Sequence, residues 1–403
     1  MSKPKIRFKG YEEDWEQRKL KNEAEFGKGN GYSKSDLTEF GTPIILYGRL
    51  YTKYENLISD VDTFVNTKDG SVYSEGGEVI VPASGETAID IARAATVEKA
   101  GILLGGDLNI IKPNNNIDSK FLSLSISNGN SQRELAKKAQ GKSVVHIHNK
   151  EIQDLIIPFP CIEEQKNISK YFFKLDRLIT LHQRKCEETK KLKKYMLQKM
   201  FPQNRKRVPE IRFAGFTDDW EQRKLGDLTT YRNGTGHEEK QSDVGKYELV
   251  NLNSISIDGG LKPSGKFIDE ETETLIKDDL VMVLSDVGHG DLLGRVAIIP
   301  ENNRFVLNQR VALLRNNGFA DTKYLFSYIN AHQRYFKLQG AGSSQLNISR
   351  GSVENFEVLL PKRDEQKQIG ECFSNLDHLI TLHQRKYEEL QKIKKFMLQN
   401  MFI

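Results

Sequence analysis

Two groups of polar side chains, each gathered in turn-rich segments, carry hydrogen-bond donors and acceptors that suit a flat polar ligand. The candidates are Lys53, Tyr54, Ser84, Gly85, Glu86, Thr87 and Arg93 in the first half, and Ser285, Asp286, His289, Asn308, Gln309, Arg310, Ser343, Ser344, Gln345 and Asn347 in the second. Arginine matches the edge of guanine, asparagine and glutamine match adenine, and serine or threonine match either base. A single residue of this kind is more often part of an ordinary polar turn. The hypothesis of base recognition therefore concerns the loops as groups.

The sequence lacks the motifs of an enzyme that works alone. The run from Gly260 to Phe267 has the spacing of a phosphate-binding loop, but Phe267 stands where a hydroxyl must bind Mg²⁺. No Pro-Pro dipeptide occurs, which excludes the loop in which amino-methyltransferases hold a flipped base. The eight histidines and three cysteines form no metal-binding pattern. We therefore expect neither catalysis nor a bound metal.

The chain contains the same arrangement of sequence elements twice. Residues 7–20 and 212–225 are identical at ten of fourteen positions, and residues 164–201 and 365–402 are identical at 25 of 38. The stretches between these repeats, about 21–155 and 226–358, show little similarity in sequence. Uniform drift after a duplication would not keep only the ends alike. We therefore expect two similar frames that carry two different surfaces.

The second repeated element predicts a long helix. Its apolar residues alternate at spacings of four and three, which is the 3.5-residue seam of a coiled coil. We expect the two copies to pack against each other along this seam. The seam residues are Ile168, Phe172, Leu175, Ile179, His182, Cys186, Thr189 and Met196 in the first copy, and Ile369, Phe373, Leu376, Ile380, His383, Tyr387, Leu390 and Met397 in the second.

A second apolar line beside each seam predicts further helical partners, because two adjacent lines are more than a simple helix pair needs. His182 and His383 occupy equivalent seam positions, where polar residues that fix the register are a better explanation than metal ligands or a proton switch. The second apolar line comprises Leu178, Leu181, Leu192 and Tyr195 in the first copy, and Leu379, Leu382, Ile393 and Phe396 in the second.

The stretches between the repeats predict mixed α/β modules. Short β-rich runs separated by Gly, Asn and Asp turns lie at 43–47, 79–82, 108–112 and 144–147, and at 247–252, 280–284, 295–300 and 311–315. Helices are expected at 119–127 and 321–330. The predicted division is a repeat element with the first module at 1–160, a long helix at 161–201, a basic linker at 202–210, a repeat element with the second module at 211–361, and a long helix at 362–403.

The composition excludes membrane, disulfide-scaffold and disordered classes. Hydrophobic residues make up 37% and charged residues 29%, and no apolar run approaches the ~18 residues of a membrane span. Three cysteines without CxxC spacing are typical of a reducing cytoplasm. The net charge of +5 is mild, and residues 21–151 hold fifteen basic and seventeen acidic residues, residues 226–360 fourteen and eighteen. A nucleic-acid surface in these modules must therefore be a local patch.

The duplicated elements give the chain a resemblance to a known family. The helices carry Pro160, Glu164, Gln165 and residues 178–185, repeated as Pro361, Glu365, Gln366 and residues 379–386, and both repeats start with Trp-Glu-Gln-Arg-Lys-Leu. The run 80–87 and the pair Asn347-Ile348 extend the likeness into the modules. Over essentially all 403 residues, the chain resembles the specificity subunit of type I restriction–modification enzymes.

The resemblance implies an α+β fold, with two mixed α/β target recognition domains separated by two long helices that pair as an antiparallel coiled coil with pseudo-twofold symmetry. Each domain would read one half of a bipartite, asymmetric site in double-stranded DNA, and the helices would set the spacer. Two modification subunits would dock on the helices and supply S-adenosylmethionine and adenine methylation. Restriction subunits would supply ATP- and Mg-dependent translocation and cleavage. This chain would bind no cofactor itself and would act in the cytoplasm of a bacterium or archaeon.

Two alternative functions, from other classes of protein, stay open. The first is a protein adaptor whose only function is its coiled coil and whose modules bind protein. The second is a self-sufficient methyltransferase or nuclease, which the missing motifs disfavour. A site-specific footprint on DNA with a partner subunit separates the first from a specificity subunit, and methyl transfer without any partner would support the second.

Overall fold

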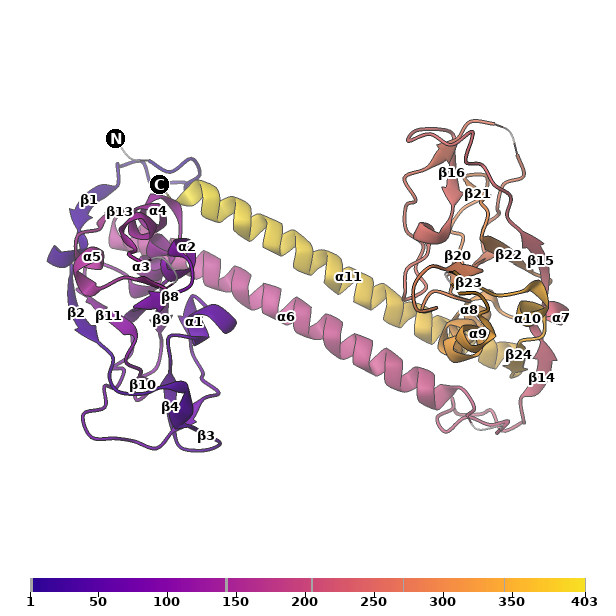
Figure 1. The fold of residues 1–403 in the computed structure, drawn as a ribbon, viewed down its shortest axis with the longest axis horizontal. Coiled ribbons are helices and arrows are strands. Elements are labelled where there is room, and N and C mark those ends of the chain that lie inside the picture. The colour runs from indigo at the N-terminus through magenta and orange to yellow at the C-terminus, as the bar shows by residue number, and fades with distance from the viewer. Residues whose placement is uncertain (1–2, 142–143, 204–205, 271, 344, 403) are drawn as a thin grey trace. The chain divides into compact units, whose positions relative to one another are not determined.

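A computed structural model describes residues 3–141, 144–203, 206–270, 272–343 and 345–402. The chain forms two compact units, unit 1 from residues 1–183 with 385–403 and unit 2 from residues 184–384. Each unit holds one α/β module and part of both long helices, α6 (Ile162–Met200) and α11 (Arg363–Met401) (Figure 1). Both helices begin and end within two residues of the bounds expected from the sequence. None of the helices in the described ranges combines the length and apolar composition of a membrane span.

Unit 1 is built around a sheet of order β2-β11-β7-β9-β5, with a second sheet of order β10-β4-β6-β3. Its strands are β1 (Glu16–Lys19), β2 (Ala24–Lys28), β3 (Leu37–Thr38), β4 (Thr42–Ile45), β5 (Leu57–Ile58), β6 (Phe64–Val65), β7 (Val79–Pro82), β8 (Ser84–Gly85), β9 (Ala95–Val97), β10 (Leu103–Leu104), β11 (Leu108–Pro113), β12 (Val145–His146) and β13 (Ile156–Phe159). Its shorter helices are α1 (Arg49–Thr52), α2 (Ala88–Ile91), α3 (Ser119–Ile126), α4 (Gly129–Lys138) and α5 (Asn149–Gln153), with 3-10 turns η1 (Leu20–Asn22) and η2 (Lys34–Asp36).

Unit 2 repeats this architecture with a sheet of order β15-β22-β18-β20 and a second sheet of order β17-β16-β21. Its strands are β14 (Glu221–Lys224), β15 (Thr229–Asn233), β16 (Tyr247–Val250), β17 (Phe267–Ile268), β18 (Leu280–Val283), β19 (Ser285–Asp286), β20 (Val296–Ile298), β21 (Phe305–Leu307), β22 (Val311–Asn316), β23 (Leu346–Asn347) and β24 (Glu357–Leu360). Its shorter helices are α7 (Leu225–Leu228), α8 (Thr322–Ala331), α9 (Gln333–Gln339) and α10 (Arg350–Glu354), with the 3-10 turn η3 (Leu252–Ser254).

The central strands are buried on both faces, which explains their continuous apolar sequences. In β7, Val79 and Val81 join a cluster with the helices, whereas Ile80 joins a second cluster that contains residues of β4 and β10. In β18, Met282 and Val281 divide in the same way. Alternate side chains of one strand therefore serve two cores, as the period of a strand requires.

The two modules, dissimilar in sequence, share one topology. β7 and β18, β8 and β19, β9 and β20, and β13 and β24 each begin 201 residues apart, and β11 and β22 begin 203 apart. The strands that the two modules share keep the same order, and β5 and β3 are additional strands of unit 1. The run at 260–267 leads into strand β17 rather than into the helix that follows a phosphate-binding loop.

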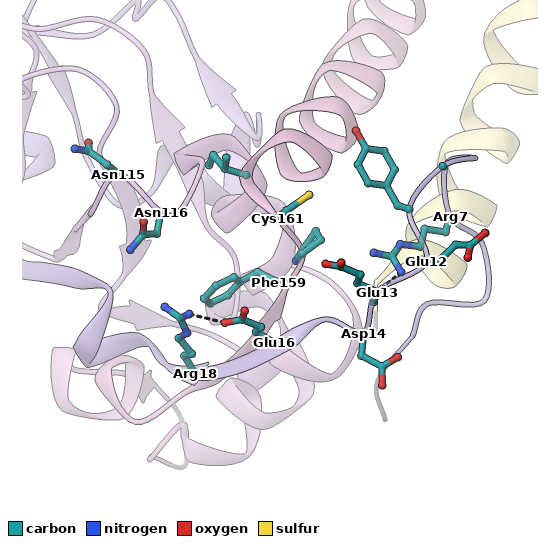
Figure 2. A pocket seen from close by; sticks show the side chains of 14 residues that line it. Arg7, Glu12, Glu13, Asp14, Glu16, Arg18, Asn115, Asn116, Phe159 and Cys161 are labelled. Carbon is teal, nitrogen blue, oxygen red and sulfur yellow. Dashed lines mark hydrogen bonds and ion pairs between the residues drawn. The ribbon is translucent and has the colours of Figure 1, made fainter.

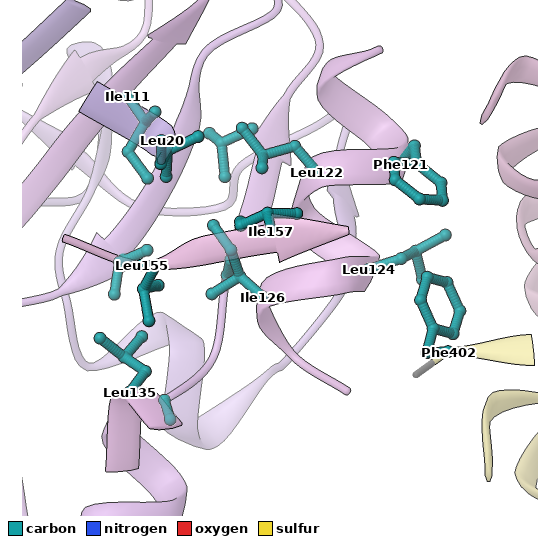
Figure 3. Close-up of a cluster of buried hydrophobic side chains, with 14 of the residues drawn as sticks. Leu20, Ile111, Phe121, Leu122, Leu124, Ile126, Leu135, Leu155, Ile157 and Phe402 are labelled. Carbon is teal, nitrogen blue, oxygen red and sulfur yellow. The ribbon is translucent and has the colours of Figure 1, made fainter. Parts of the chain in front are cut away.

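Each long helix ends in a Met-Phe pair that completes a module core. In unit 1 the ring of Phe402 lies 5.8 Å from the rings of Phe121 and Phe172. Figure 3 shows Phe402, at the end of α11, directed at the cluster that contains Phe121 of α3. In unit 2 the ring of Phe201 lies 5.6 Å from that of Phe373. The repeated tail is therefore a structural anchor in both units.

The helices run antiparallel in both units. In unit 1, Asp176 of α6 forms an ion pair with Lys394 of α11. In unit 2, Lys193 of α6 lies 2.5 Å from Asp377 of α11. Rising residue numbers in one helix pair with falling numbers in the other, which confirms the expected fold class of mixed α/β modules with an antiparallel pair of long helices.

Candidate nucleic-acid interface

A buried ion pair fastens each repeat element to its long helix. Glu164 accepts two hydrogen bonds of 2.7 Å from Arg7, and Glu365 accepts hydrogen bonds of 2.7 and 2.8 Å from Arg212. Both glutamate side chains are fully buried. The hydrogen bond to the carboxylate raises the pKa of each arginine above its usual value. The Glu of the repeated Pro-x3-Glu-Gln pattern therefore orients the repeat element.

The neighbouring glutamine fastens the module's own helix. Gln165 Oε1 accepts a hydrogen bond of 2.9 Å from the backbone nitrogen of Asp118, whose side chain caps α3. Gln366 accepts the equivalent bond of 2.8 Å from Asp321, the cap of α8. A Glu-Gln pair at the start of each long helix thus fixes the direction of a module, so the repeats act as frames rather than as readers.

A cleft of about 640 Å³ lies beside the first frame, between the repeat element and the start of α6. Figure 2 shows its carboxylates, among them Glu12, Glu13 and Asp14, around the opening, with Arg18 paired to Glu16. An acidic cleft repels phosphate. A surface that contacts DNA is therefore expected elsewhere on the modules.

The loops with the predicted polar residues leave from one end of the main sheet in each module. In unit 1, β7 ends opposite the start of β11, and Ala83 and Ile147 are joined by a backbone hydrogen bond of 3.0 Å just beyond that edge. In unit 2, β18 ends at Val283, opposite Val311 of β22, and Ile348 donates to the carbonyl of Leu284. The sheet edge therefore gathers segments that are distant in sequence.

In unit 1, Ser84 and Gly85 form β8, which pairs with β12, and the exposed Glu86 follows directly. Thr87 caps α2, and its hydroxyl donates to Asp90 at 2.7 Å. Arg93 forms an ion pair with the same aspartate.

The remaining two predicted residues of unit 1 have internal partners. Lys53 pairs with Asp62 at 2.9 Å. The hydroxyl of Tyr54 bonds to Ala94 and Ser127 at 3.0 Å, and burial raises its pKa to about 12. Within this loop group, Ser84 and Glu86 are thus better placed to meet a ligand than Tyr54.

In unit 2, Ser285 and Asp286 form β19, which pairs with Asn347 and Leu346 of β23. The Ser285 hydroxyl donates to Asn347 Oδ1 at 2.5 Å, and Gln345 also donates to this oxygen at 3.3 Å. Asp286 accepts from the backbone nitrogens of residues 288 and 292 and so shapes the loop that carries the exposed His289. Ser343 is exposed, and Ser344 lies outside the described residues.

The segment 308–310 meets the loop that follows β15. Asn308 is buried and accepts a hydrogen bond of 3.2 Å from the backbone of His237, while Gln309 bonds to Glu238. Arg310 has a φ of 68° and its carbonyl accepts from Leu284 at 2.9 Å. The structure therefore brings the segments 285–286, 308–310 and 345–347 to one sheet edge, although they are up to 62 residues apart.

His146 is a residue at this edge that the sequence interpretation missed. It pairs with Ser84 across β8 and β12, and its Nδ1 lies 3.2 Å from the Ser84 hydroxyl. It is exposed and corresponds, 201 residues apart, to Asn347, which pairs with Ser285. Applying the repeat offset to Asn347 would have found it. One structural position therefore carries an imidazole in unit 1 and an amide in unit 2.

The predicted seam residues lie on the least exposed side of their helices. Ile168, Phe172, Ile369 and Phe373 are at most 1% exposed and pack into the module cores as well. The rest are less buried, with Leu175 at 7%. The half-buried seam residues are Ile179, His182, Thr189, Met196, Leu376, Ile380, His383, Tyr387 and Met397.

The part of the chain that the structure describes holds no group of three His, Cys, Asp or Glu side chains that could bind a metal ion. The three cysteines, Cys161, Cys186 and Cys372, are free.

Comparisons with known proteins agree with this geometry. The "Type I restriction enzyme MjaVIII specificity subunit" of Methanocaldococcus jannaschii is 24% identical over 312 residues, 74% of this chain and 72% of the relative. The "Putative type I restriction enzyme MjaX specificity subunit" of the same archaeon is 24% identical over 400 residues, 95% of this chain and 91% of the relative. The crystal structure of a type I restriction–modification S subunit from M. genitalium has the same fold, with a TM-score of 0.66, 15% identity and coverage of 100% of this chain and 99% of that chain.

The family model described as the type I restriction modification DNA specificity domain matches the chain twice, at residues 12–191 and 217–392. Each match contains the Trp-Glu-Gln-Arg-Lys-Leu part of one repeat element, one polar sheet edge and most of one long helix. The chain therefore belongs to the type I restriction–modification DNA specificity family, whose members recognise the DNA target and leave catalysis to other subunits.

Proposed function

We propose that this chain is the specificity subunit of a type I restriction–modification complex and that each module reads one half of a bipartite, asymmetric DNA site. The observation that carries the proposal is the exposed position at the sheet edge, which is His146 in unit 1 and Asn347 in unit 2. Similar repeat elements that carry different residues at the equivalent exposed position give two different half-sites. Asparagine suits adenine, whereas an imidazole presents a different pattern of donors and acceptors.

The long helices have the features of a spacer and a docking site. Each is continuous over 39 residues, about 58 Å at ~1.5 Å per residue. Apart from the half-buried Leu178, the second apolar line is exposed on both helices, with Leu192 at 49%, Tyr195 at 51%, Leu382 at 50% and Phe396 at 55%. Exposed apolar lines of this length are suited to packing against helices of a partner. Two copies of the same line fit two identical modification subunits.

The partners then divide the chemistry. Modification subunits would bind S-adenosylmethionine and methylate adenine, and restriction subunits would use ATP and Mg. We infer a cytoplasmic location in a bacterium or archaeon, where the DNA and the partners meet; both curated relatives named above come from an archaeon. Because both modules are net acidic, we expect weak DNA binding by the isolated chain and full affinity only with the modification subunit.

Methylome sequencing of cells with and without this chain tests the proposal. A split motif with methylated adenine should be present only with the chain. As a matched control, replacing residues 21–155 with the corresponding module of another family member should change one half of the motif and leave the other half unchanged. No motif, together with a stable complex with other proteins, would favour the protein adaptor. Methyl transfer by the purified chain alone would favour an enzyme.

A further inference from the structure

Each unit contains a cleft between its two helix segments and the start of one short module helix. In unit 2 the cleft measures about 590 Å³ and lies between α6, α11 and α9, and in unit 1 the cleft of about 840 Å³ lies between α11, α6 and α4. The two clefts are equivalent. Lys194 and Gln198 of the first correspond to Lys395 and Gln399 of the second, 201 residues apart.

Both clefts are basic, in contrast to the acidic modules around them. The cleft of unit 2 has five basic and two acidic side chains, and that of unit 1 three basic and one acidic. The acidic Asp377 and Asp176 are already paired with Lys193 and Lys394. Among the described residues no ion pair is formed by the remaining exposed cations, which include Lys194, Arg334, Lys395 and Arg133.

A buried guanidinium adds to the positive charge in unit 2. Arg295 Nη1 donates to the carbonyl of Asn330 at 3.2 Å, and its Nε is buried without a hydrogen-bond partner among the described residues. Burial lowers the pKa of this arginine because it disfavours the charged form. Asp258, the second acidic residue that lines this cleft, interacts electrostatically with Arg295 and offsets part of this effect, and an anion in the cleft would compensate the charge further.

The clefts lie on the helix face opposite the second apolar line. At ~100° per residue, Lys190 and Lys194 point about 160–200° away from Leu192. The same spacing separates Gln391 and Lys395 from Ile393. Helices of a partner that pack on the apolar line would therefore leave both clefts open. This separation favours an occupant other than those helices.

A short helix connects each cleft to the polar sheet edge of the same module. Arg133 lies in α4, and seven residues later Gln140 forms a bridge with His146. Arg334 lies in α9, and seven residues later Ala341 forms a bridge with Asn347. The helical part of each interval, residues 133–138 and 334–339, spans about 9 Å at ~1.5 Å per residue. Each module therefore carries an exposed arginine and its polar sheet edge within one short, continuous segment of the chain.

We propose that the two clefts bind phosphates of the DNA backbone and position each module on the duplex without reading its sequence. The proposal rests on the function proposed above and assigns to it the phosphate contacts that the acidic modules lack. Arginine, lysine and glutamine are the side chains that commonly hold backbone phosphates. The same residue types occur at equivalent positions of both clefts, which fits a ligand that is the same in both half-sites. The residues proposed to contact bases, in contrast, differ between the modules.

The test uses the chain assembled with its modification subunit. Lys194→Gln with Arg334→Gln alters the cleft of unit 2, and Arg133→Gln with Lys395→Gln alters that of unit 1. Lys191→Gln with Lys392→Gln is the matched control, because these exposed lysines lie on the same helices outside the clefts. Binding is measured over a range of salt concentrations, both to a DNA duplex that contains the motif found by methylome sequencing and to a duplex in which that motif is scrambled. Assembly is checked by size-exclusion chromatography.

Each cleft variant should weaken binding to both duplexes by the same factor, about tenfold or more. The slope of log affinity against log salt should become shallower by about 0.9 for each lost phosphate contact. An affinity and slope equal to those of the control would overturn the proposal, as would a loss of assembly with the modification subunit, which would place protein in the clefts. Failure of the proposed function is a different result: the wild-type complex would not distinguish the two duplexes, while the salt slopes would still report on the clefts.

Discussion

Arg212 and Glu365 form a two-bond ion pair that is 12% exposed at the arginine and fully buried at the glutamate. Arg7 and Glu164 form the same pair in unit 1. Removing one partner of such a buried ion pair strongly destabilises the fold, because the charge of the other partner is then buried without compensation. The pair therefore makes the orientation of each repeat element depend on one side chain of each long helix.

Glu365→Gln should lower the free energy of unfolding of unit 2 by about 3–5 kcal/mol, the usual cost of leaving one buried charge. The chain has two tryptophans, Trp15 and Trp220, one in each unit. In a Trp15→Phe background, the fluorescence of Trp220 during urea unfolding therefore reports on unit 2. Glu221→Gln, which removes an exposed ion pair, is the control and should have little effect. Equal effects of the two variants would contradict the anchoring role of Glu365.

Phe201→Ala should destabilise unit 2 by about 3–5 kcal/mol, because it leaves a cavity in the aromatic core. The ring of Phe201 lies 5.2 Å from Tyr328 and 5.6 Å from Phe373, and the residue is 1% exposed. Tyr195→Ala on the same helix is the control, since this ring is half exposed and should matter for partner docking only. The same Trp220 measurement applies. An equally large loss of stability for Tyr195→Ala and Phe201→Ala would contradict the role of Phe201 as an anchor in the core of unit 2.

His332 should make the stability of unit 2 depend on pH. Burial lowers the pKa of His332, which stacks 4.1 Å from Tyr328, below its usual value of about 6.5. The folded state therefore favours the neutral ring. Stability is complete above the pKa of the unfolded chain and is lost as the pH falls from there towards the folded pKa. His332→Phe keeps the stacking and should reduce this slope in Trp220-monitored unfolding. A slope equal to that of the parent would exclude His332 as its source.

The sequence predicted the elements whose pattern is local. The long helices follow from the 3.5-residue seam, and β7, β11, β18 and β22 follow from short apolar runs that are buried on both faces. It did not predict β2, because only two of its five residues, Ala24 and Phe26, are apolar, and because it is the outermost strand of its sheet and only half-buried. The fold of such a strand is decided by its partner, β11.

The common topology of the modules and the composition of the polar edges could not be predicted from the sequence, for a related reason. Ser84 and His146 are 62 residues apart, and only the pairing of β8 with β12 brings them together. Loop positions such as Tyr54 look like binding residues by type, yet its hydroxyl is satisfied within the protein. Hydrogen-bond partners of a polar side chain depend on long-range contacts that no local pattern encodes.

Asn347→Ala should relax the half-site read by unit 2 and leave the other half-site intact. A good amide–adenine pair contributes about 1–3 kcal/mol of discrimination, so the preference at one base pair should fall by about 5- to 150-fold. His146→Ala should act on the other half-site only. Methylome sequencing of cells with each variant measures both. Asn355→Ala, at the C-terminal end of α10 away from the edge, is the control. A change in both half-sites from either variant would contradict independent reading.

The spacer should follow the length of the helices. Four residues inserted at a heptad-compatible place in one long helix add about 6 Å, and at 3.4 Å per base pair the recognised spacer should widen by about one or two base pairs. Both half-sites should keep their sequence, because the frames at Glu164 and Glu365 are unchanged. The same four residues inserted in the linker 202–210 are the control, since the linker is outside both helices. The methylated motif shows the result directly. A spacer that stays the same with the helix insertion, in a complex that still methylates DNA, would mean that something other than the helices sets the distance.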